Sequence, residues 1–382
     1  MSCATSGEFD DVLGRKMLPS LNGLRFIAVL FVVLSHAGLF SFFVDSVTFF
    51  LVLSGFLFTV LLDRECQATG TISLKSFYAR RTIRVFPAVY AFVAVTICGK
   101  LLLGVPVAWG HALSGVTFTA NYYNALYDHP ATGFSSLWSM AVQEQFYLLW
   151  PLTFLLLAPY GHRRMAMVLA MVVIVGCLWR THCVLSGASA AYAYNTFETR
   201  VDSLAIGCLT GLLTTSRSFR RVFAASTRTG LEPIVPLAGL YLLSTPGEVS
   251  RLGVGFTLQS MLLGLLLLQL IQLGHHPLWR WLNARPMDLL GTLSFSAYLY
   301  HHWGISLGHV AGGSLWLSGA VSVIGTFLLA AGSYYVIERP FVELRSRLRT
   351  KAMPRVPATV PGPTLIGAAD STGIQSSVPL SS

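Results

Sequence analysis

The feature that most constrains this sequence is the recurrence of apolar runs long enough to cross a lipid bilayer. A transmembrane helix needs about 20 apolar residues to cross a hydrocarbon core about 30 Å thick. Only 11% of the 382 residues are charged and 54% are hydrophobic, whereas a soluble domain has roughly a quarter of its residues charged. The chain is therefore expected to fold inside a membrane.

The apolar runs predict about ten transmembrane helices. They are expected at 22–40, 47–62, 83–103, 137–157, 165–185, 200–215, 232–245, 253–273, 289–309 and 315–337. The sixth and seventh of these spans are short. We find no internal repeat, so the expected fold class is an all-α polytopic membrane helix bundle.

The distribution of basic residues supports this count and gives an orientation. With a cytoplasmic N-terminus, the segments on the cytoplasmic side, counted up to residue 351, hold 20 lysines and arginines, whereas the outer segments hold two, Arg180 and Arg251. Positive charge is retained on the cytoplasmic side during insertion. Both termini are therefore expected in the cytoplasm of a multi-pass protein of the cell (inner) membrane. The net charge of +10 then reflects topology, and no nucleic-acid partner is expected.

The chain divides into one large transmembrane region and two tails. We expect a cytoplasmic N-terminal tail over 1–20, a transmembrane domain over 21–345, and a basic, then disordered, cytoplasmic tail over 346–382, where Pro, Ser, Thr and Gly are frequent. The first apolar run is expected to be retained, because no cleavage site follows it. The six cysteines show no metal-ligand spacing, so no metal is expected.

Two ionisable residues lie on the first predicted helix, where each needs a reason to be in a bilayer. Arg25 and His36 are eleven residues apart, which places them within about 20° of one helix face and about 16 Å apart along its axis. That face would offer an anion-binding group and a titratable base. The alternative is that Arg25 snorkels to the membrane surface and that His36 is a hydrogen-bonded core residue.

Two further charged groups stand out in the next part of the chain. Glu144 lies about 10 Å into the helix over 137–157, close to the depth expected for His36, and could orient that imidazole if the two helices touch. Arg80, Arg81 and Arg84 end a cytoplasmic connection. The spacing of Arg81 and Arg84 suits bidentate contact with phosphate, although positive-inside anchoring would also place arginines there.

Polar groups near the outer side and in the ninth span complete the candidates. Arg200 and Asp202 could form an interfacial pair with nearby charges, and Asp45 is expected to cap the second span. Tyr298, His301 and His302 lie about midway along the span over 289–309. They could line a cavity or satisfy one another by hydrogen bonds.

These groups occur in an order that resembles the acyltransferase 3 family, the bacterial membrane O-acyltransferases that modify surface glycans, antibiotics and related acceptors. The matching segments, which run through most of the chain, are LNGLRFIAVLFVVLSH (21–36), FFLVLSGFLFT (49–59), the Arg-x-x-Arg of 81–84, LWSMAVQEQFYLLWP (137–151), TRVDSLAIGCLTG (199–211), LSFSAYLYHHW (293–303) and VIERPF (336–341). Two features depart from the family. Gln143 stands where the family's first glutamate is usual, and the esterase-like C-terminal domain of many relatives is not expected here.

The resemblance implies transfer of an acyl group, with acetyl expected, from cytoplasmic acyl-CoA to a hydroxyl of a carbohydrate acceptor, with a cell-surface polysaccharide expected. It implies catalytic roles for His36, as general base or acyl carrier, and Glu144, as its support. It also implies CoA-phosphate binding by Arg25, Arg81 and Arg84, substrate contacts by Tyr298, His301 and Asp202, and no metal.

Three alternatives stay open at this point. The acceptor could be a small-molecule glycoside such as a macrolide. A polytopic transporter would share the many spans and buried charges, but more often shows repeated halves. A non-catalytic partner in glycan assembly would not need the register of Arg25 and His36. The sequence carries no signal of oligomeric state.

Overall fold

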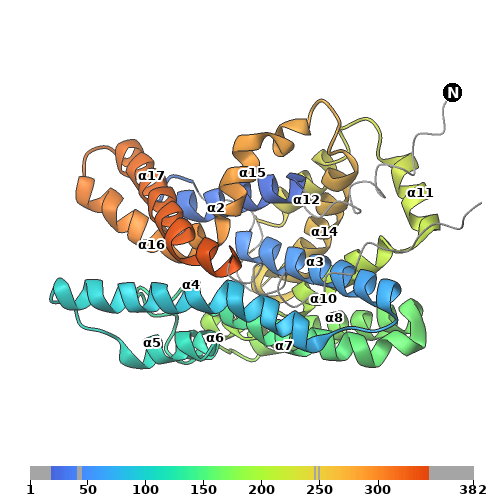
Figure 1. Ribbon diagram of the computed structural model, residues 1–382, viewed down its shortest axis with the longest axis horizontal. Coiled ribbons are helices and arrows are strands. Elements are labelled where there is room, and N and C mark those ends of the chain that lie inside the picture. The colour runs from blue at the N-terminus through green and yellow to red at the C-terminus, as the bar shows by residue number, and fades with distance from the viewer. Residues whose placement is uncertain (1–18, 41–44, 245–246, 248–249, 344–382) are drawn as a thin grey trace, which may run out of the picture.

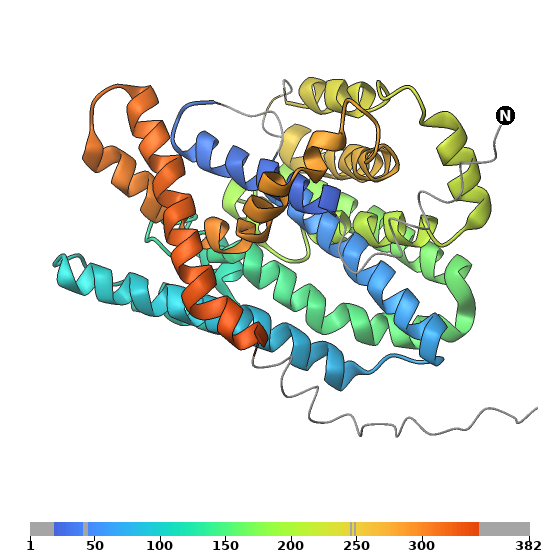
Figure 2. The ribbon, with the colours of Figure 1, turned by 45° about the horizontal axis from the view of Figure 1, so that its top comes forward.

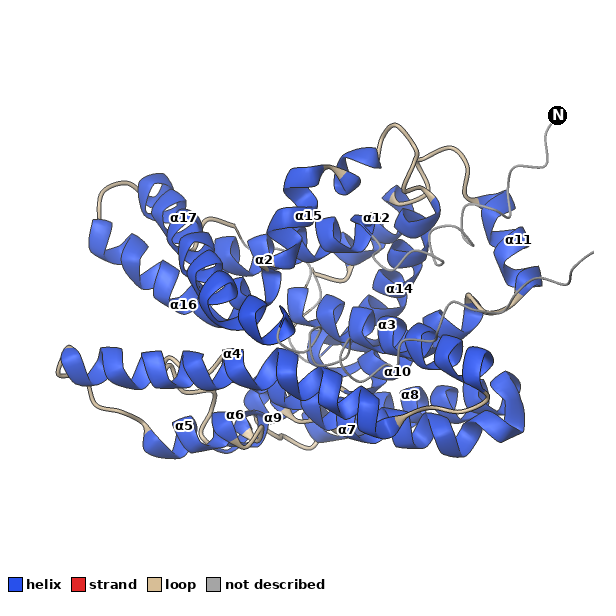
Figure 3. Cartoon of the chain, in the orientation of Figure 1, coloured by secondary structure: helices blue, strands red, loops and turns tan. Residues whose placement is uncertain are grey.

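The computed structural model describes residues 19–40, 45–244, 247 and 250–343. Within these ranges the secondary structure is helical and contains no strand (Figure 3), which confirms the all-α prediction. The longer helices are α2 (Pro19–His36), α3 (Ser46–Thr69), α4 (Leu74–Leu102), α7 (Leu137–Leu157), α8 (Gly161–Leu185), α10 (Val201–Leu213), α14 (Phe256–Gln272), α16 (Ser294–Ala311) and α17 (Leu315–Ser333).

Shorter helices connect the long ones. They are α5 (Trp109–Val116), α6 (Ala120–Leu126), α9 (Ala190–Asn195), α11 (Arg217–Ser226), α12 (Ile234–Leu242), α15 (Arg285–Thr292), the 3₁₀ turns η1 (Ala158–Tyr160) and η3 (Arg280–Asn283), and the π-type turns η2 (Arg251–Gly255) and η4 (Tyr334–Glu338). The predicted tails over 1–18 and 344–382 lie outside the described residues.

Within the described ranges, five helical segments are long and apolar enough to cross a membrane, which supports a membrane protein. They are Ser46–Thr69, Leu74–Leu102, Leu137–Leu185, Arg251–Gln272 and Leu315–Glu343. The third contains 49 residues, and it is interrupted at Gly161, whose φ of 81° is a left-handed conformation that favours glycine. Its two parts, α7 and α8, coincide with the spans predicted at 137–157 and 165–185.

Four of the ten predicted spans have shorter helices than expected. The run at 200–215 forms the 13 residues of α10, and the run at 232–245 forms only the 9 residues of α12, about 14 Å of helix. The first run stops at His36 in α2, and the ninth is divided between α15 and α16. The count of ten spans and the orientation of the termini remain predictions.

The helices pack around a central pair, α2 and α3 (Figures 1 and 2). Helix α3 contacts α10, α10 also contacts α8, α2 contacts α15, and α16 pairs with α17. The approach of α3 to α10 depends on small residues, because a Cβ on Gly207 would lie 2.1 Å from the carbonyl oxygen of Val52, and one on Gly55 would lie 2.1 Å from that of Leu204. Small residues allow such close helix contacts in membranes.

Helix α3 also positions the polar groups at its two ends. Asp45 accepts hydrogen bonds from the backbone N–H groups of Val47 and Thr48, both at 3.3 Å, so it caps the first turn as predicted. At the other end, Gly70 adopts φ 76° and its N–H bonds to the carbonyl oxygen of Cys66, a common way to end a helix.

Candidate active site

Helix α2 carries its two ionisable residues to two different cavities. His36 is the last residue of α2 and lines a cavity of about 430 Å³, which we call the histidine pocket. Arg25 lines a second cavity of about 160 Å³, the arginine pocket. Each cavity therefore receives one end of the helix.

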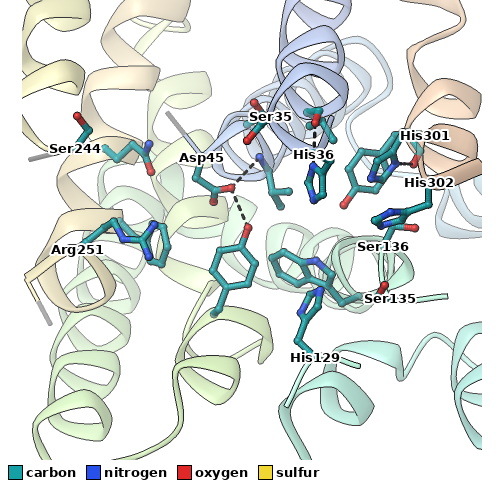
Figure 4. Close-up of a pocket in the computed structure, with 18 of the residues that line it drawn as sticks. Ser35, His36, Asp45, His129, Ser135, Ser136, Ser244, Arg251, His301 and His302 are labelled. Carbon is teal, nitrogen blue, oxygen red and sulfur yellow. Dashed lines mark hydrogen bonds between the residues drawn. The ribbon is translucent and has the colours of Figure 1, made fainter. Parts of the chain in front are cut away.

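The histidine pocket is lined by polar and aromatic side chains from distant parts of the chain (Figure 4). They include Ser35, His36, Asp45, His129, Ser135, Ser136, Trp138, Tyr194, Arg251, Gln259, Tyr298, His301 and His302. Most ligand cavities in proteins have volumes of about 300–1,000 Å³. This cavity could therefore take a sugar unit, and its lining offers hydrogen-bonding groups beside aromatic faces.

Three imidazoles meet on one wall of this pocket. The ring centroid of His36 lies 5.1 Å from that of His301 and 5.4 Å from that of His302, and the two α16 rings are 4.1 Å apart. His36 Nδ1 lies 2.9 Å from the carbonyl oxygen of Val32. Because a carbonyl can only accept, Nδ1 carries the proton of the neutral ring and Nε2 keeps its lone pair.

His129 lies on another side of the pocket and was not predicted. Its Nδ1 is 2.9 Å from Oδ1 of Asn195, and burial lowers the pKa of this imidazole, which favours its neutral form. His129 and the preceding Asp128 have φ values of 52° and 55°. Such left-handed backbone is uncommon outside glycine and clusters at functional sites. The one sequence signal that could have identified this loop histidine is its place in a connection predicted to lie on the outer side.

Asp45 and Arg200 form an ion pair beside the pocket. Arg200 NH2 lies 2.8 Å from Oδ2 of Asp45, and the Arg200 guanidinium lies 4.1 Å from the ring centroid of Phe256. The hydroxyl of Tyr194 also donates to Asp45, at 3.0 Å. These contacts agree with the capping and pairing roles expected of both charges, and they hold Tyr194 at the pocket wall.

Asp202 differs from its expected role as a substrate contact. Its Oδ1 accepts from Arg180 at 2.8 Å, its Oδ2 accepts from the hydroxyl of Thr257, and the side chain is fully buried. Both oxygens are engaged, and Asp202 is not among the residues that line the histidine pocket. The structure therefore gives this carboxylate a place in an internal ion pair with Arg180.

The arginine pocket gathers the three arginines that the sequence singled out. Arg25 comes from α2, whereas Arg81 and Arg84 come from α4. Arg81 donates from Nε and NH2 to Oε1 of Glu144, at 2.9 and 2.8 Å, and its guanidinium lies 3.6 Å from the ring centroid of Tyr147. Among the described residues, no carboxylate lies within ion-pair distance of Arg25 or Arg84, although the buried carboxylate of Glu338 interacts with both at longer range. Two guanidinium groups without a direct ion-pair partner make this pocket suited to anionic groups.

The partner of Glu144 is therefore Arg81 and not His36. The matching depth of Glu144 and His36 suggested that they would meet, but Glu144 does not line the histidine pocket. Depth along two helices says nothing about which faces turn toward each other. Gln143, the residue that departs from the family pattern, does face the arginine pocket, where its Oε1 accepts from the hydroxyl of Tyr147 at 3.2 Å.

The two pockets adjoin at Tyr298. This buried side chain lines both cavities, and its hydroxyl accepts a hydrogen bond from Ser139 at 2.7 Å. Val47 also lines both. Tyr298 and Val47 therefore mark the place where the two cavities adjoin.

Comparison with known proteins gives a consistent family result. The sequence model of the family described as "Acyltransferase domain" matches residues 18–337. The chain is 28% identical over 365 residues to the peptidoglycan O-acetyltransferase OatA of Listeria monocytogenes, which covers 85% of this chain and 56% of that protein. It is also 28% identical over 359 residues to the O-acetyltransferase OatA of Staphylococcus aureus, covering 85% and 57%.

A third relative has nearly the same coverage. The chain is 27% identical over 356 residues to the putative peptidoglycan O-acetyltransferase YrhL of Bacillus subtilis, covering 85% of this chain and 55% of that protein. The chain thus spans little more than half the length of these relatives. No solved structure matches it significantly.

Proposed function

The chain belongs to the acyltransferase 3 family, and from this we propose that it is a membrane O-acyltransferase that moves an acyl group from acyl-CoA to a hydroxyl of a carbohydrate. Acetyl is the proposed acyl group, because the relatives are named O-acetyltransferases. The proposed acceptor is a cell-surface polysaccharide, since two relatives are named for peptidoglycan. The catalytic unit is the transmembrane domain over 21–345.

The observation that supports this proposal most directly is that two pockets with complementary chemistry adjoin each other. The arginine pocket offers two guanidinium groups without a direct ion-pair partner, those of Arg25 and Arg84, and CoA carries phosphates that arginine binds well. The histidine pocket offers unprotonated imidazole nitrogens beside serines and aromatic rings, which suit a sugar hydroxyl and its base. Because Tyr298 lines both, a thioester entering from the arginine side would meet a hydroxyl on the histidine side.

The proposed topology matches this division. With ten spans and cytoplasmic termini, Arg25, Arg81 and Arg84 fall near the cytoplasmic side, where acyl-CoA is available. His36, His129 and Arg251 fall at the outer ends of spans or in outer connections, where a surface glycan arrives. Donor and acceptor would therefore approach from opposite faces of the inner membrane.

Arg25 and Arg84 are the proposed phosphate ligands. Arg81 would contribute less charge, because Glu144 neutralises it. We assign Glu144 the role of holding the Arg81 guanidinium over Tyr147, at the wall of the arginine pocket. This replaces the earlier expectation that Glu144 supports His36.

His36 is the proposed general base. Its Nε2 takes the proton of the acceptor hydroxyl while that oxygen bonds to the thioester carbonyl carbon, and the carbon–sulfur bond then breaks. The imidazolium returns the proton to the departing CoA sulfur, so the products are the ester and free CoA. General-base assistance typically accelerates such a step by 10²–10⁴-fold.

The direct test uses the purified protein in lipid nanodiscs. Acetyl-CoA labelled in the acetyl group is mixed with polysaccharide fragments from the host surface or, in a parallel reaction, with a small-molecule glycoside, and the label transferred to each acceptor is measured by mass spectrometry. We expect labelled ester and an equal amount of free CoA. Consumption of neither substrate would contradict the enzyme proposal, and label on a small-molecule glycoside alone would contradict the polysaccharide acceptor.

A further inference from the structure

The three imidazoles of the histidine pocket have the arrangement of a metal-ligand set. One ring nitrogen each of His36, His301 and His302 lies within 4.8 Å of the other two. Figure 4 shows the three side chains directed toward one another, from α2 on one side and α16 on the other.

Backbone carbonyls orient two of these rings. His36 Nδ1 donates to the carbonyl oxygen of Val32 at 2.9 Å, and His301 Nδ1 donates to that of Tyr298 at 2.6 Å. Both rings thereby keep an unprotonated Nε2 on the far side. Metal-binding histidines almost always make this kind of hydrogen bond with the other ring nitrogen, because it fixes the tautomer and the ring orientation.

The Nε2 atom of His301 provides a second, independent observation. Within the described part of the chain this atom is buried and has no hydrogen-bond partner, and the side chain is only 1% exposed. A buried polar atom without a partner costs about 1–3 kcal/mol. A cation bound at this nitrogen would satisfy it.

The donor atoms identify the class of cation. Neutral imidazole nitrogens suit Zn²⁺ and its neighbours, whereas Mg²⁺ and Ca²⁺ require oxygen ligands. The carboxylate that lines the same pocket, Asp45, is already engaged by Arg200 and by the α3 N-terminus. Zinc–nitrogen bonds of about 2.0–2.1 Å place the ligand nitrogens of a tetrahedral site about 3.4 Å apart, so the three nitrogens, now within 4.8 Å of one another, would move closer on binding. The open pocket leaves the fourth position to water.

We propose that His36, His301 and His302 form a three-histidine site for a divalent transition-metal cation of the Zn²⁺ class. Its consequence for turnover rests on the function proposed above. A cation on Nε2 of His36 uses the lone pair that would accept the hydroxyl proton. Metal binding and general-base catalysis therefore exclude each other, and zinc inhibits transfer reversibly.

Binding is tested first, without reference to activity. The full-length protein in nanodiscs is stripped with a chelator, and Zn²⁺ alone is titrated by calorimetry, with Co²⁺ absorption reporting the coordination geometry. We expect one strong site with a tetrahedral cobalt spectrum. His301→Gln and His302→Gln should each weaken this site at least tenfold, whereas His309→Gln, on the exposed end of α16, should leave it unchanged.

Several results would overturn the site. They are the absence of a strong site in the wild type, or equal affinity in the wild type and both cluster variants. Having two cluster variants guards against misfolding of one, which circular dichroism and size-exclusion chromatography would reveal. If His309→Gln lost the site as well, the cluster would not be the ligand set.

Activity is measured separately, on acetyl transfer. Zinc at micromolar concentration should lower wild-type turnover more than tenfold, and chelator should restore it. If chelation abolished turnover, the metal would be required for catalysis, which would contradict the proposal that metal binding at His36 prevents general-base catalysis. Zinc binding by a protein without any transfer activity would refute the proposed function and leave the metal site standing.

Discussion

At the residue scale, two contacts set the chemical state and position of the proposed site residues, one made by a backbone carbonyl and one by a carboxylate. The carbonyl of Val32 fixes which nitrogen of His36 is free, and Glu144 fixes the position of Arg81. The Val32 contact is local to α2 and depends on the rotamer of His36, whereas the contact of Glu144 with Arg81 depends on which faces of α4 and α7 meet, so the sequence identified neither partner. The candidate residues themselves could be identified, since ionisable groups inside apolar runs are costly and few.

Arg84 is predicted to bind the donor. Arg84→Ala should raise the KM for acyl-CoA about tenfold or more with little change in kcat, because phosphate contacts supply binding to ground and transition state alike. Arg84→Lys should restore part of the loss, since an ammonium cannot reproduce the guanidinium fork. Steady-state kinetics with varied acyl-CoA would measure both.

The matched control is Arg80→Ala, whose side chain is partly exposed and paired with Glu65. Equal KM values for Arg84→Ala and wild type would contradict donor binding and would favour positive-inside anchoring as the role of Arg84.

Glu144 is predicted to act through Arg81. Glu144→Gln should raise the KM for acyl-CoA and leave the pH dependence of kcat unchanged, because the carboxylate contacts the arginine pocket and not the proposed base. A double-mutant cycle with Arg81→Gln should give a coupling free energy of about 0.5–3 kcal/mol, as for other residues in contact. Additive effects of the two substitutions, or a changed pH profile of kcat, would contradict this assignment.

At the element scale, hydropathy predicts where helices lie better than how long they are. Nine predicted spans coincide with a helix of 13 residues or more over much of their length, but α12 has only 9 residues and the run at 289–309 is broken between α15 and α16. Apolar composition does not distinguish a helix that crosses the bilayer from a short one packed inside the bundle. The meeting of α2 with α16, which creates the histidine cluster, is a tertiary contact that no local pattern encodes.

The contact between α3 and α10 gives the prediction at this scale. Gly207→Ala should lower stability by about 1–3 kcal/mol, the usual cost of overpacking, because its Cβ would lie 2.1 Å from the carbonyl oxygen of Val52. The thermal unfolding midpoint in detergent would measure the loss. Gly332→Ala, on α17 with no atom within 4 Å of the new methyl group, is the matched control. If the unfolding midpoint of Gly207→Ala equalled that of the control, α3 and α10 could move apart without loss of stability, and the prediction would be wrong.

At the scale of the whole molecule, the arrangement of charge and pockets implies one direction of transfer. The arginine pocket gathers groups near the predicted cytoplasmic side, and the histidine pocket gathers groups near the predicted outer side. The sequence predicted this polarity through its basic residues, whereas the existence of two cavities meeting at Tyr298 required the structure.

Reporter fusions test that polarity. Fusions after residues 70, 225 and 352 should report the cytoplasm, and fusions near 120 and 190 should report the periplasm, following the 20 to two division of basic residues. Alkaline phosphatase and green fluorescent protein would serve as the paired reporters. A periplasmic signal at 225 would overturn the topology from the sixth span onward.

The central claim is that His36 performs the proton transfer between hydroxyl and thioester. The measurement that tests it most directly is the turnover of His36→Ala and His36→Gln in nanodiscs, beside acyl-CoA binding by the same preparations and His309→Ala as the control. Both His36 variants should bind acyl-CoA normally and lose about 10²-fold or more in acetyl transfer, as expected on removal of a general base, while the control retains full turnover. A His36→Ala protein that keeps more than about a tenth of wild-type turnover would contradict the claim.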